Sequence, residues 1–250
     1  TILHIGALSI VAESVAQPER YFKVNLVGSI ALLDAAIAVG IKRLIFSSSA
    51  AVYGAPSASV LHEELPLAPV NPYGATKAAF EQVLRAYAAA HGLTAIALRY
   101  FNVAGATELV SERHNPETHL LPRLMSAALA GEPFPIYGND YATPDRTAVR
   151  DYVHVADVAA AHLAAIEKLA AEGAHGFSAI NIGSGAGTSI REAIKAIEKA
   201  SGARIEVQEH PRRAGDPPRL VADISKAQSQ LGWRPRQSDI NRIVKSLLPK

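Results

Sequence analysis

Strand-like apolar runs alternate with helical patterns along this chain, and this alternation is the feature that most constrains its fold. The predicted strands are 1–7, 41–49, 93–101 and 175–185, and the predicted helices are 18–40 and 73–91. Pro18 near the start of the first helix, and Gly40 and Gly92 at the helix ends, are typical boundary residues. Strands joined by helices of this length form right-handed crossovers. The sequence therefore predicts an α/β fold, with a parallel sheet covered by helices on both faces.

Two stretches are less regular and predict a smaller lobe beside the sheet. The first, 103–150, contains a predicted helix at 120–131 and a short strand at 134–138. The second, 185–250, has two helical patterns around a strand-like run at 204–210. We therefore expect two domains. The first joins 1–102 with 151–184, and the second joins 103–150 with 185–250.

Composition excludes several classes of function. The chain has no cysteine, which excludes disulfides, thiolate zinc sites and cysteine nucleophiles. Its nine histidines show no tight ligand spacing, so no metal site is predicted. A formal net charge of +2 is too small to indicate a nucleic-acid partner. No apolar run looks long enough to span a bilayer, so no membrane association is expected.

Tyr73 and Lys77 lie four residues apart and share one face of a predicted helix. A cation within roughly 4–6 Å of a phenol favours the phenolate, so the pair could act as a general acid/base. By itself, however, this spacing usually indicates an aromatic ring beside a solvated lysine. Ser47, Ser48 and Ser49 end a predicted strand, where ligands gather in parallel sheets. The alternative is that these serines satisfy backbone groups at the turn.

Four motifs together resemble one family. "FSSSAAVYG", "NPYGATKAAFE", "LRYFNVAGA" and "VRDYVHVADVAAAH" are similar, in order and spacing, to the extended short-chain dehydrogenase/reductase family. The resemblance is greatest to its UDP-glucose 4-epimerases, also called UDP-galactose 4-epimerases, and runs from the first residues to about Trp233. It implies a Rossmann-like fold in which 1–102 and 151–184 form a partial NAD-binding domain. The lobe of 103–150 and 185–250 would then bind the nucleotide sugar.

The resemblance also implies a reaction, the reversible 4-epimerisation of UDP-glucose and UDP-galactose through a 4-keto intermediate. Tyr73 would act as base and acid, Lys77 as its electrostatic partner and Ser49 as a hydrogen-bonding relay, with NAD as the cofactor that borrows and returns the hydride. Such an isomerase belongs to galactose metabolism. It would be a cytoplasmic homodimer that associates through the helices at 18–40 and 72–91.

Further site residues follow from the same resemblance. The implied cofactor contacts are Ile5, Gly6, Ala7, Leu8, Ser9, Asn25, Ser49, Tyr73, Lys77 and Phe101. The implied substrate contacts are Ser49, Tyr73, Asn102, His119, Leu120, Tyr137, Arg150, Arg213 and Asp216. Among these, Tyr137 is expected near the uracil and Asp216 at the ribose. The planar guanidinium groups of Arg150 and Arg213 suit a diphosphate, because each can donate two bonds at once.

One pair of residues separates the chain from a neighbouring branch of this family, and one missing stretch departs from the family pattern. Related dehydratases carry an Asp–Glu pair where this chain has Ala50 and Ala51, and alanine cannot move a proton, so dehydration is disfavoured. Family members begin with a strand, a GxxGxxG turn and a helix that holds the NAD pyrophosphate. No such stretch occurs here, so we expect a fragment that binds NAD poorly. The alternatives are another UDP-sugar epimerase, a 4-keto-sugar reductase or an inactive nucleotide-sugar-binding remnant.

A glycine-rich stretch, "NIGSGAGTS", could be mistaken for a dinucleotide-binding turn. It contains Gly183, Gly185 and Gly187, but the third glycine falls one place too early for GxGxxG. We expect instead a strand followed by a helix, with Ser189 and Glu192 forming a capping box.

Overall fold

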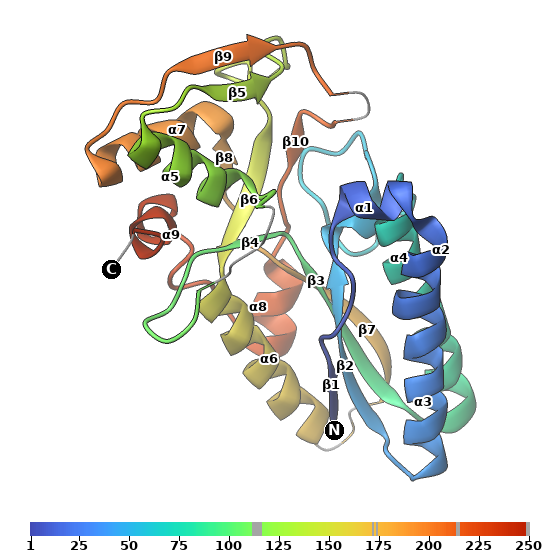
Figure 1. The fold of residues 1–250 in the computed structure, drawn as a ribbon. Coiled ribbons are helices and arrows are strands. Elements are labelled where there is room, and N and C mark those ends of the chain that lie inside the picture. Colours follow the sequence, from blue (N-terminus) through green and yellow to red (C-terminus); the bar gives the residue numbers. More distant parts are fainter. Residues whose placement is uncertain (112–116, 172, 174, 214–215, 249–250) are drawn as a thin grey trace.

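The fold is a central parallel sheet with helices on both sides and a smaller lobe beyond one end of the sheet, as Figure 1 shows. The structure is a computed structural model, and it describes residues 1–111, 117–171, 173, 175–213 and 216–248. The sheet has four parallel strands in the order β1-β2-β3-β7. They are β1 (Ile2–His4), β2 (Arg43–Ser49), β3 (Thr94–Tyr100) and β7 (Gly176–Ile182). The predicted α/β fold is confirmed.

Two layers of helix sandwich this sheet. On one face lie α1 (Val11–Ala16), α2 (Pro18–Tyr21), η1 (Phe22–Val27), α3 (Gly28–Ala38) and α4 (Pro72–His91). On the other face lie α6 (Val155–Ala170) and α8 (Ser225–Leu231). Phe46, Phe80 and Leu84 fill the layer between α4 and the sheet, and Leu98 and Ile180 belong to the layer under α6. Burial of these apolar side chains is the main force that holds the layers together.

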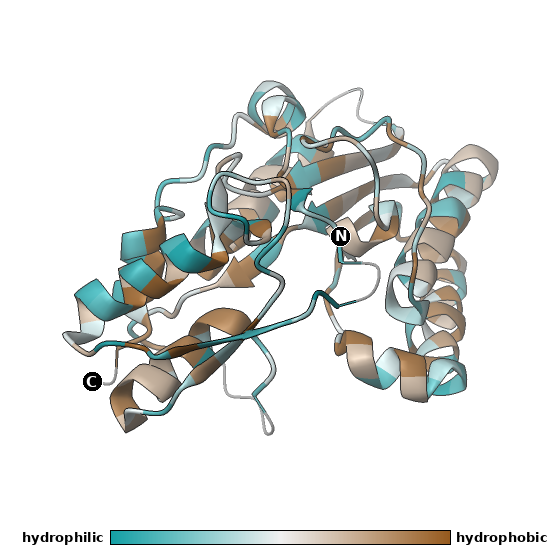
Figure 2. Cartoon of the chain, turned by 90° about the horizontal axis from the view of Figure 1, so that it is seen from above, coloured by the Kyte–Doolittle hydropathy of each residue, from teal (hydrophilic) through white to brown (hydrophobic). Residues whose placement is uncertain are grey.

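The predicted helix at 18–40 is real, but its exposure corrects one expectation. Elements α2, η1 and α3 form one helical run from Pro18 to Ala38, with Pro18 at its first turn and Gly40 at φ 77° after its end. This run has 21 residues, and an 18-residue window within it has a mean hydropathy of 1.4, with 28% of that window buried. By length and composition alone it is long and apolar enough to cross a membrane, contrary to the sequence analysis. Figure 2 shows hydrophobic colour along these helices.

Strand β1 confirms the strand predicted at 1–7, but it is shorter and lies exposed at an edge. It pairs with β2 on one side and lies at the edge of the sheet. The side chain of Leu3 is 42% exposed and that of Ile5, just after the strand, is 58% exposed. An apolar run that alternates little cannot by itself distinguish a central strand from an edge strand, because both have the same composition.

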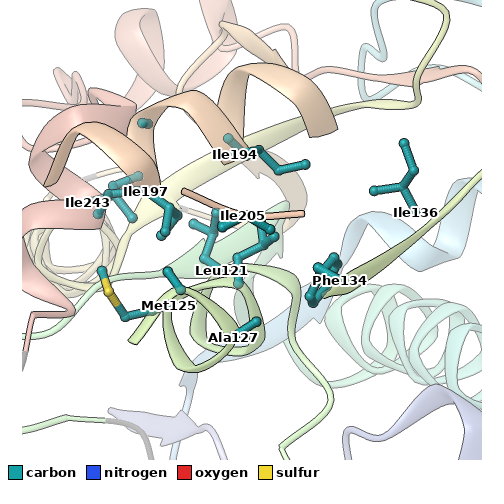
Figure 3. Close-up of a cluster of buried hydrophobic side chains, with 14 of the residues drawn as sticks. Leu121, Met125, Ala127, Phe134, Ile136, Ile194, Ile197, Ile205 and Ile243 are labelled. Carbon is teal, nitrogen blue, oxygen red and sulfur yellow. The ribbon is translucent and has the colours of Figure 1, made fainter. Parts of the chain in front are cut away.

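The smaller lobe is built from two sheets and three helices. The first sheet joins β10 (Arg219–Leu220), β6 (Val149–His154) and β4 (Asn102–Ala104), and β8 (Gly187–Ser189) pairs antiparallel with β6. The second pairs β5 (Phe134–Tyr137) with β9 (Val207–His210). The helices are α5 (Leu120–Ala130), α7 (Ile190–Ser201) and α9 (Ile240–Ser246). Figure 3 shows their shared core, in which Leu121, Met125, Phe134, Ile197 and Ile243 converge.

Candidate active site

The site forms where the end of β2 meets the start of α4. Strand β2 ends at Ser49, and the chain turns through the short 3₁₀ helix η2 (Ala50–Tyr53). Helix α4 begins after Asn71, whose side-chain oxygen accepts a hydrogen bond of 2.8 Å from the backbone NH of Gly74. A Cβ on Gly74 would lie 2.5 Å from the carbonyl oxygen of Ala51. The absence of a side chain at Gly74 therefore lets the first turn of α4, which carries Tyr73, press against the turn that follows Ser49.

Lys77 lies one turn after Tyr73 and points into the protein. Its side chain is 4% exposed, and Nζ donates a hydrogen bond of 2.7 Å to the carbonyl oxygen of Ser47. Nζ also lies 4.8 Å from the ring centroid of Phe46 and 5.8 Å from that of Tyr73. Burial lowers the pKa of the Lys77 ammonium to about 8, because a desolvated charge is disfavoured.

The Tyr73 phenol interacts with the side chain of Ser49. Burial raises the pKa of Tyr73, and a hydrogen bond with the Ser49 side chain acts in the opposite direction. The sequence analysis expected Lys77 to lower this pKa, and the net direction is the reverse. The physical reason is that desolvation outweighs the hydrogen bond that favours the phenolate. The structure thus brings together Ser49, Tyr73 and Lys77. Burial favours the neutral phenol of Tyr73 and the neutral amine of Lys77.

The segment expected along the cofactor is anchored to α4. Asn25 clamps Leu8 from both sides: the backbone NH of Leu8 donates to Oδ1 at 2.9 Å, and Nδ2 donates to the carbonyl of Leu8 at 2.9 Å. Nδ2 of Asn25 also lies 3.3 Å from the hydroxyl of Thr76, which is on α4 between Tyr73 and Lys77. The surrounding residues of this segment are open to solvent or half-buried; they are Ile5, Gly6, Ala7 and Ser9.

Phe101, which the resemblance places beside the cofactor, is buried in the structure. Its side chain is 5% exposed, and it belongs to a cluster with Val52, Tyr53 and Ala78. This cluster supports the turn after Ser49 and the first half of α4. Phe101 is therefore next to the site, at the end of β3.

The residues expected at the nucleotide sugar divide into two groups. Leu120, Tyr137, Arg213 and Asp216 line one pocket of about 100 Å³ in the smaller lobe. The Arg213 guanidinium lies 4.2 Å from the ring centroid of Tyr137. Arg150 joins this group through a hydrogen-bonded ion pair with Asp216.

Asn102 and His119 are not among the residues that line this pocket, although both chain neighbours of His119, Thr118 and Leu120, line it. Asn102 is exposed on β4. His119 is exposed at the start of α5, and its Nδ1 lies 2.9 Å from a carboxylate oxygen of Glu117. The structure therefore brings Tyr137, Arg150, Arg213 and Asp216 together, while Asn102 and His119 are exposed and contact none of these four in the described hydrogen bonds and ion pairs.

The sequence analysis missed one polar chain beneath the site. The hydroxyl groups of Ser47 and Tyr100 are 2.7 Å apart, and the Tyr100 hydroxyl is 2.8 Å from Nε2 of His162 on α6. Burial raises the pKa of Tyr100. Tyr100 could have been predicted near the site from its position in the sequence. It ends β3 as Ser49 ends β2, and the two strands are neighbours. His162 carried no signal, since only the packing of α6 brings it near.

The glycine-rich stretch holds a carboxylate of the chain itself. Asp151 is fully buried and accepts hydrogen bonds from the backbone NH groups of Ser184, Gly185 and Ala222. A Cβ on Gly183 would lie 2.6 Å from Oδ2 of Asp151, so this turn is already filled. The predicted capping box between Ser189 and Glu192 is present at the start of α7.

Comparisons with known proteins agree with this geometry. The sequence model of the family described as GDP-mannose 4,6 dehydratase matches residues 1–247. A UDP-glucose 4-epimerase from Corynebacterium glutamicum is 43% identical over 97% of this chain and 73% of its own length. A crystal structure of UDP-glucose 4-epimerase from Brucella ovis in complex with NAD is 44% identical, with a TM-score of 0.92, over 98% of this chain and 75% of the other.

A third relative was solved with a nucleotide sugar. The UDP-glucose 4-epimerase from Stenotrophomonas maltophila, with bound NAD and formylated UDP-arabinopyranose, is 38% identical with a TM-score of 0.93. The match covers 98% of this chain and 74% of that one. These likenesses extend over both the sheet that carries Ser49 and Tyr73 and the lobe that carries Arg213. The chain accordingly belongs to the extended short-chain dehydrogenase/reductase family, in the branch of the UDP-glucose 4-epimerases.

Proposed function

We propose that this chain catalyses the reversible 4-epimerisation of UDP-glucose and UDP-galactose, with NAD as its cofactor and a 4-keto sugar as the intermediate. The observation that carries the proposal is the meeting of Ser49, Tyr73 and Lys77 at the end of β2. That constellation is present in a chain whose relatives, over nearly its whole length, are UDP-glucose 4-epimerases. Ala50 and Ala51, which follow Ser49, supply no acid or base for dehydration.

The proposed proton chemistry centres on the Tyr73 phenol. As a phenolate, Tyr73 accepts the proton of the sugar 4-hydroxyl when C4 loses its hydride, and it returns that proton when the hydride comes back. Ser49 bridges the sugar oxygen and the phenol by hydrogen bonds, and the Lys77 ammonium stabilises the phenolate by its charge. Because the proton and the hydride both return to the substrate, the reaction causes no net oxidation.

The residues present fit a dinucleotide near Tyr73. Within the described residues, the hydrogen bond of Lys77 Nζ to Ser47 uses one of three ammonium donors, so two remain for ribose hydroxyls. Asn25 fixes the backbone of Leu8 beside α4, which shapes the segment 5–9 as one wall. Bound NAD would supply the hydride acceptor that amino-acid side chains lack. Phe101, at the end of β3, would border the nicotinamide.

The smaller lobe would hold the nucleotide. Arg150 and Arg213 would bind the diphosphate, Asp216 the ribose and Tyr137 the uracil. In the ligand-free chain, Arg150 pairs with Asp216 and Arg213 stacks on Tyr137, so these side chains already satisfy one another. The proposed domains are 1–102 with 151–184 for the cofactor and 103–150 with 185–250 for the nucleotide sugar. Two elements cross this division, since β6 lies in a sheet of the smaller lobe and α8 packs on the central sheet.

We extend the proposal to assembly and location. Apolar side chains are exposed along the helical run from Pro18 to Ala38, among them Val24 at 46% and Val27 at 59%. The run packs beside α4, where the Tyr87 hydroxyl donates a hydrogen bond of 2.5 Å to Asp34. Two copies that bury this face against each other would form a homodimer. The proposed location is the cytoplasm, in keeping with a UDP-sugar substrate.

A conversion assay tests the proposed function. The chain is incubated with UDP-glucose and NAD in large excess, and the sugar protons are followed by NMR. We expect UDP-galactose to accumulate while the absorbance of NADH stays constant. NADH that rises or falls in step with turnover would instead indicate a reductase, and a lack of conversion at saturating NAD would rule the proposal out.

A further inference from the structure

A buried ion pair lies between the helix that carries Tyr73 and the sheet. Glu81 on α4 and Arg99 on β3 have side chains that are 1% and 2% exposed. Two parallel hydrogen bonds join them, from Nε to Oε1 at 3.0 Å and from Nη2 to Oε2 at 2.6 Å. This bidentate geometry fixes both the distance and the orientation of the partners.

Other polar groups complete a network around this pair. The Ser48 hydroxyl donates to Oε1 of Glu81 at 2.6 Å. Nη1 of Arg99 donates to the Tyr53 hydroxyl at 2.8 Å, and that hydroxyl donates to Oδ1 of Asn181 at 2.7 Å. Burial alone would lower the pKa of Arg99, but the hydrogen bonds and the charge of Glu81 raise it overall, so the Arg99 guanidinium stays charged.

The network touches every element that carries a proposed catalytic side chain, yet it contains none of them. Glu81 lies one turn beyond Lys77 and two turns beyond Tyr73 on α4. Ser48 lies on β2 between Ser47, whose carbonyl accepts the Lys77 bond, and Ser49. A shift of α4 along the sheet would therefore disrupt the Glu81 bonds and the contact between Tyr73 and Ser49 together.

Stability alone is a weak reason to keep such a pair. Replacing a buried ion pair by apolar side chains of similar volume is commonly neutral or stabilising, because desolvation of the charges is costly. The same layer already accepts apolar side chains, since Phe46, Phe80 and Leu84 fill it nearby. Apolar contacts tolerate sliding, whereas a bidentate pair has one favourable register. The pair is thus suited to setting the position of α4.

We propose that Glu81 and Arg99, together with Ser48 and Tyr53, are positioning residues that set the register of α4 on the sheet and hold the Tyr73 phenol at Ser49. This inference rests on the catalytic roles proposed above. It assigns to the network the task of keeping the reacting groups in a productive geometry. A displacement of about 1 Å can lower turnover roughly a hundredfold.

The test uses the whole 250-residue chain. A double variant, Glu81→Leu with Arg99→Met, removes one negative and one positive charge, so the net charge is unchanged. The matched control is Arg191→Met with Glu209→Leu, an ion pair of the same residue types that lies exposed in the smaller lobe. Three quantities are measured: the Cζ resonance of Tyr73 in ¹³C-tyrosine-labelled protein, assigned with Tyr73→Phe, and the kcat and the KM for UDP-glucose.

We expect the double variant to fold, as judged by its thermal unfolding, and to differ from the wild type in the Tyr73 resonance and in kcat. The Tyr73 resonance and its titration midpoint should move, kcat should fall roughly tenfold to a hundredfold, and KM should change by less than about twofold. The control pair should leave the resonance and kcat as in the wild type. A folded double variant with wild-type kcat and an unmoved Tyr73 resonance would overturn the proposal.

Two milder variants decide the matter if the double variant does not fold. Ser48→Ala and Tyr53→Phe each remove hydrogen bonds of the network without leaving a charge unpaired. Both should move the Tyr73 resonance in the same direction by a smaller amount, and an unmoved resonance in both would refute the inference. The NMR readout requires no turnover. If the wild-type chain fails to epimerise, the proposed function falls, while the position of Tyr73 is still measured.

Discussion

Tyr73 is the side chain whose chemistry can be removed with the least change in structure. Replacing it with phenylalanine keeps the ring against Lys77 and deletes only the hydroxyl that meets Ser49. We expect Tyr73→Phe to lower kcat about a hundredfold or more, since the base for the 4-hydroxyl is lost. The matched control is Tyr87→Phe on the same helix, whose hydroxyl contacts Asp34 on α3. Equal rates for both variants would refute the assigned base.

The two pKa directions at the site predict a particular pH dependence. The reaction needs Tyr73 as phenolate and Lys77 as ammonium, while burial raises the pKa of Tyr73 and lowers that of Lys77 to about 8. With the base pKa above the acid pKa, kcat/KM should rise roughly tenfold per pH unit below about pH 8 and then level off. The levelling marks the point at which Lys77 loses its charge as fast as Tyr73 gains one.

A charge-preserving variant separates these two titrations. In Lys77→Arg the cation persists at all accessible pH values, so kcat/KM should continue to rise beyond pH 8 instead of levelling. A wild-type profile that is flat from pH 6 to 8 would be inconsistent with this pair of pKa directions. Spacing alone did not single out this pair, and the four motifs were needed beside it. The sign of the Tyr73 pKa shift could not be predicted from the sequence, because burial depends on the packing of α4.

At the scale of the element, proline and glycine predicted the ends of the helices well. Pro18, Gly40 and Gly92 delimit helices close to the expected ends, since proline and glycine act through local backbone geometry. Strands β4, β8 and β10 have two or three residues each and were missed. So short a strand shows no periodicity, and it forms only because β6 lies beside it. Helix α6 (Val155–Ala170) was not among the predicted helices.

The exposed face of the helical run from Pro18 to Ala38 carries the prediction for assembly. Val27 is 59% exposed on this face, and a charge there would have to be desolvated in a dimer. We expect the wild-type chain to be a dimer and Val27→Asp to be a monomer when each is measured by size-exclusion chromatography with light scattering. Leu163→Asp, at a comparably exposed site on α6, should remain dimeric. A monomeric wild-type chain would contradict the proposed interface.

At the scale of the whole molecule, the smaller lobe assembles from segments far apart in sequence. Arg150 on β6 meets Asp216, which precedes β10, and the Asp151 carboxylate joins β6 to the glycine turn and to Ala222. The sequence analysis predicted that the two irregular stretches would form a lobe. It could not predict these contacts, because no local pattern records which loops a buried carboxylate will tie together.

Two partly buried histidines, His4 and His154, make the stability of the folded molecule depend on pH. Burial and the nearby Lys77 charge lower the pKa of His4, and burial lowers that of His154 despite Asp157. In the unfolded chain both should titrate near about 6.5. The unfolded state therefore binds more protons below that pH, so their contribution to stability is present above it and is lost as the pH falls.

This linkage can be measured by urea unfolding at pH 7 and at pH 5.5. The free energy of unfolding should be lower at the more acidic pH, and His4→Gln should reduce the difference because one of the two groups is gone. His175→Gln, at an exposed histidine, should leave the difference unchanged. A difference that is the same in His4→Gln as in the wild type would show that His4 does not titrate in this range.

The measurement that tests the central claim most directly follows the hydrogen at C4. UDP-glucose labelled with deuterium at C4 is converted by the chain in water with NAD in excess, and the UDP-galactose formed is examined by NMR. If hydride leaves C4 and returns to the opposite face while Tyr73 holds the hydroxyl proton, the deuterium should remain at C4 of the product. Product that has exchanged its C4 deuterium for solvent hydrogen would contradict this account.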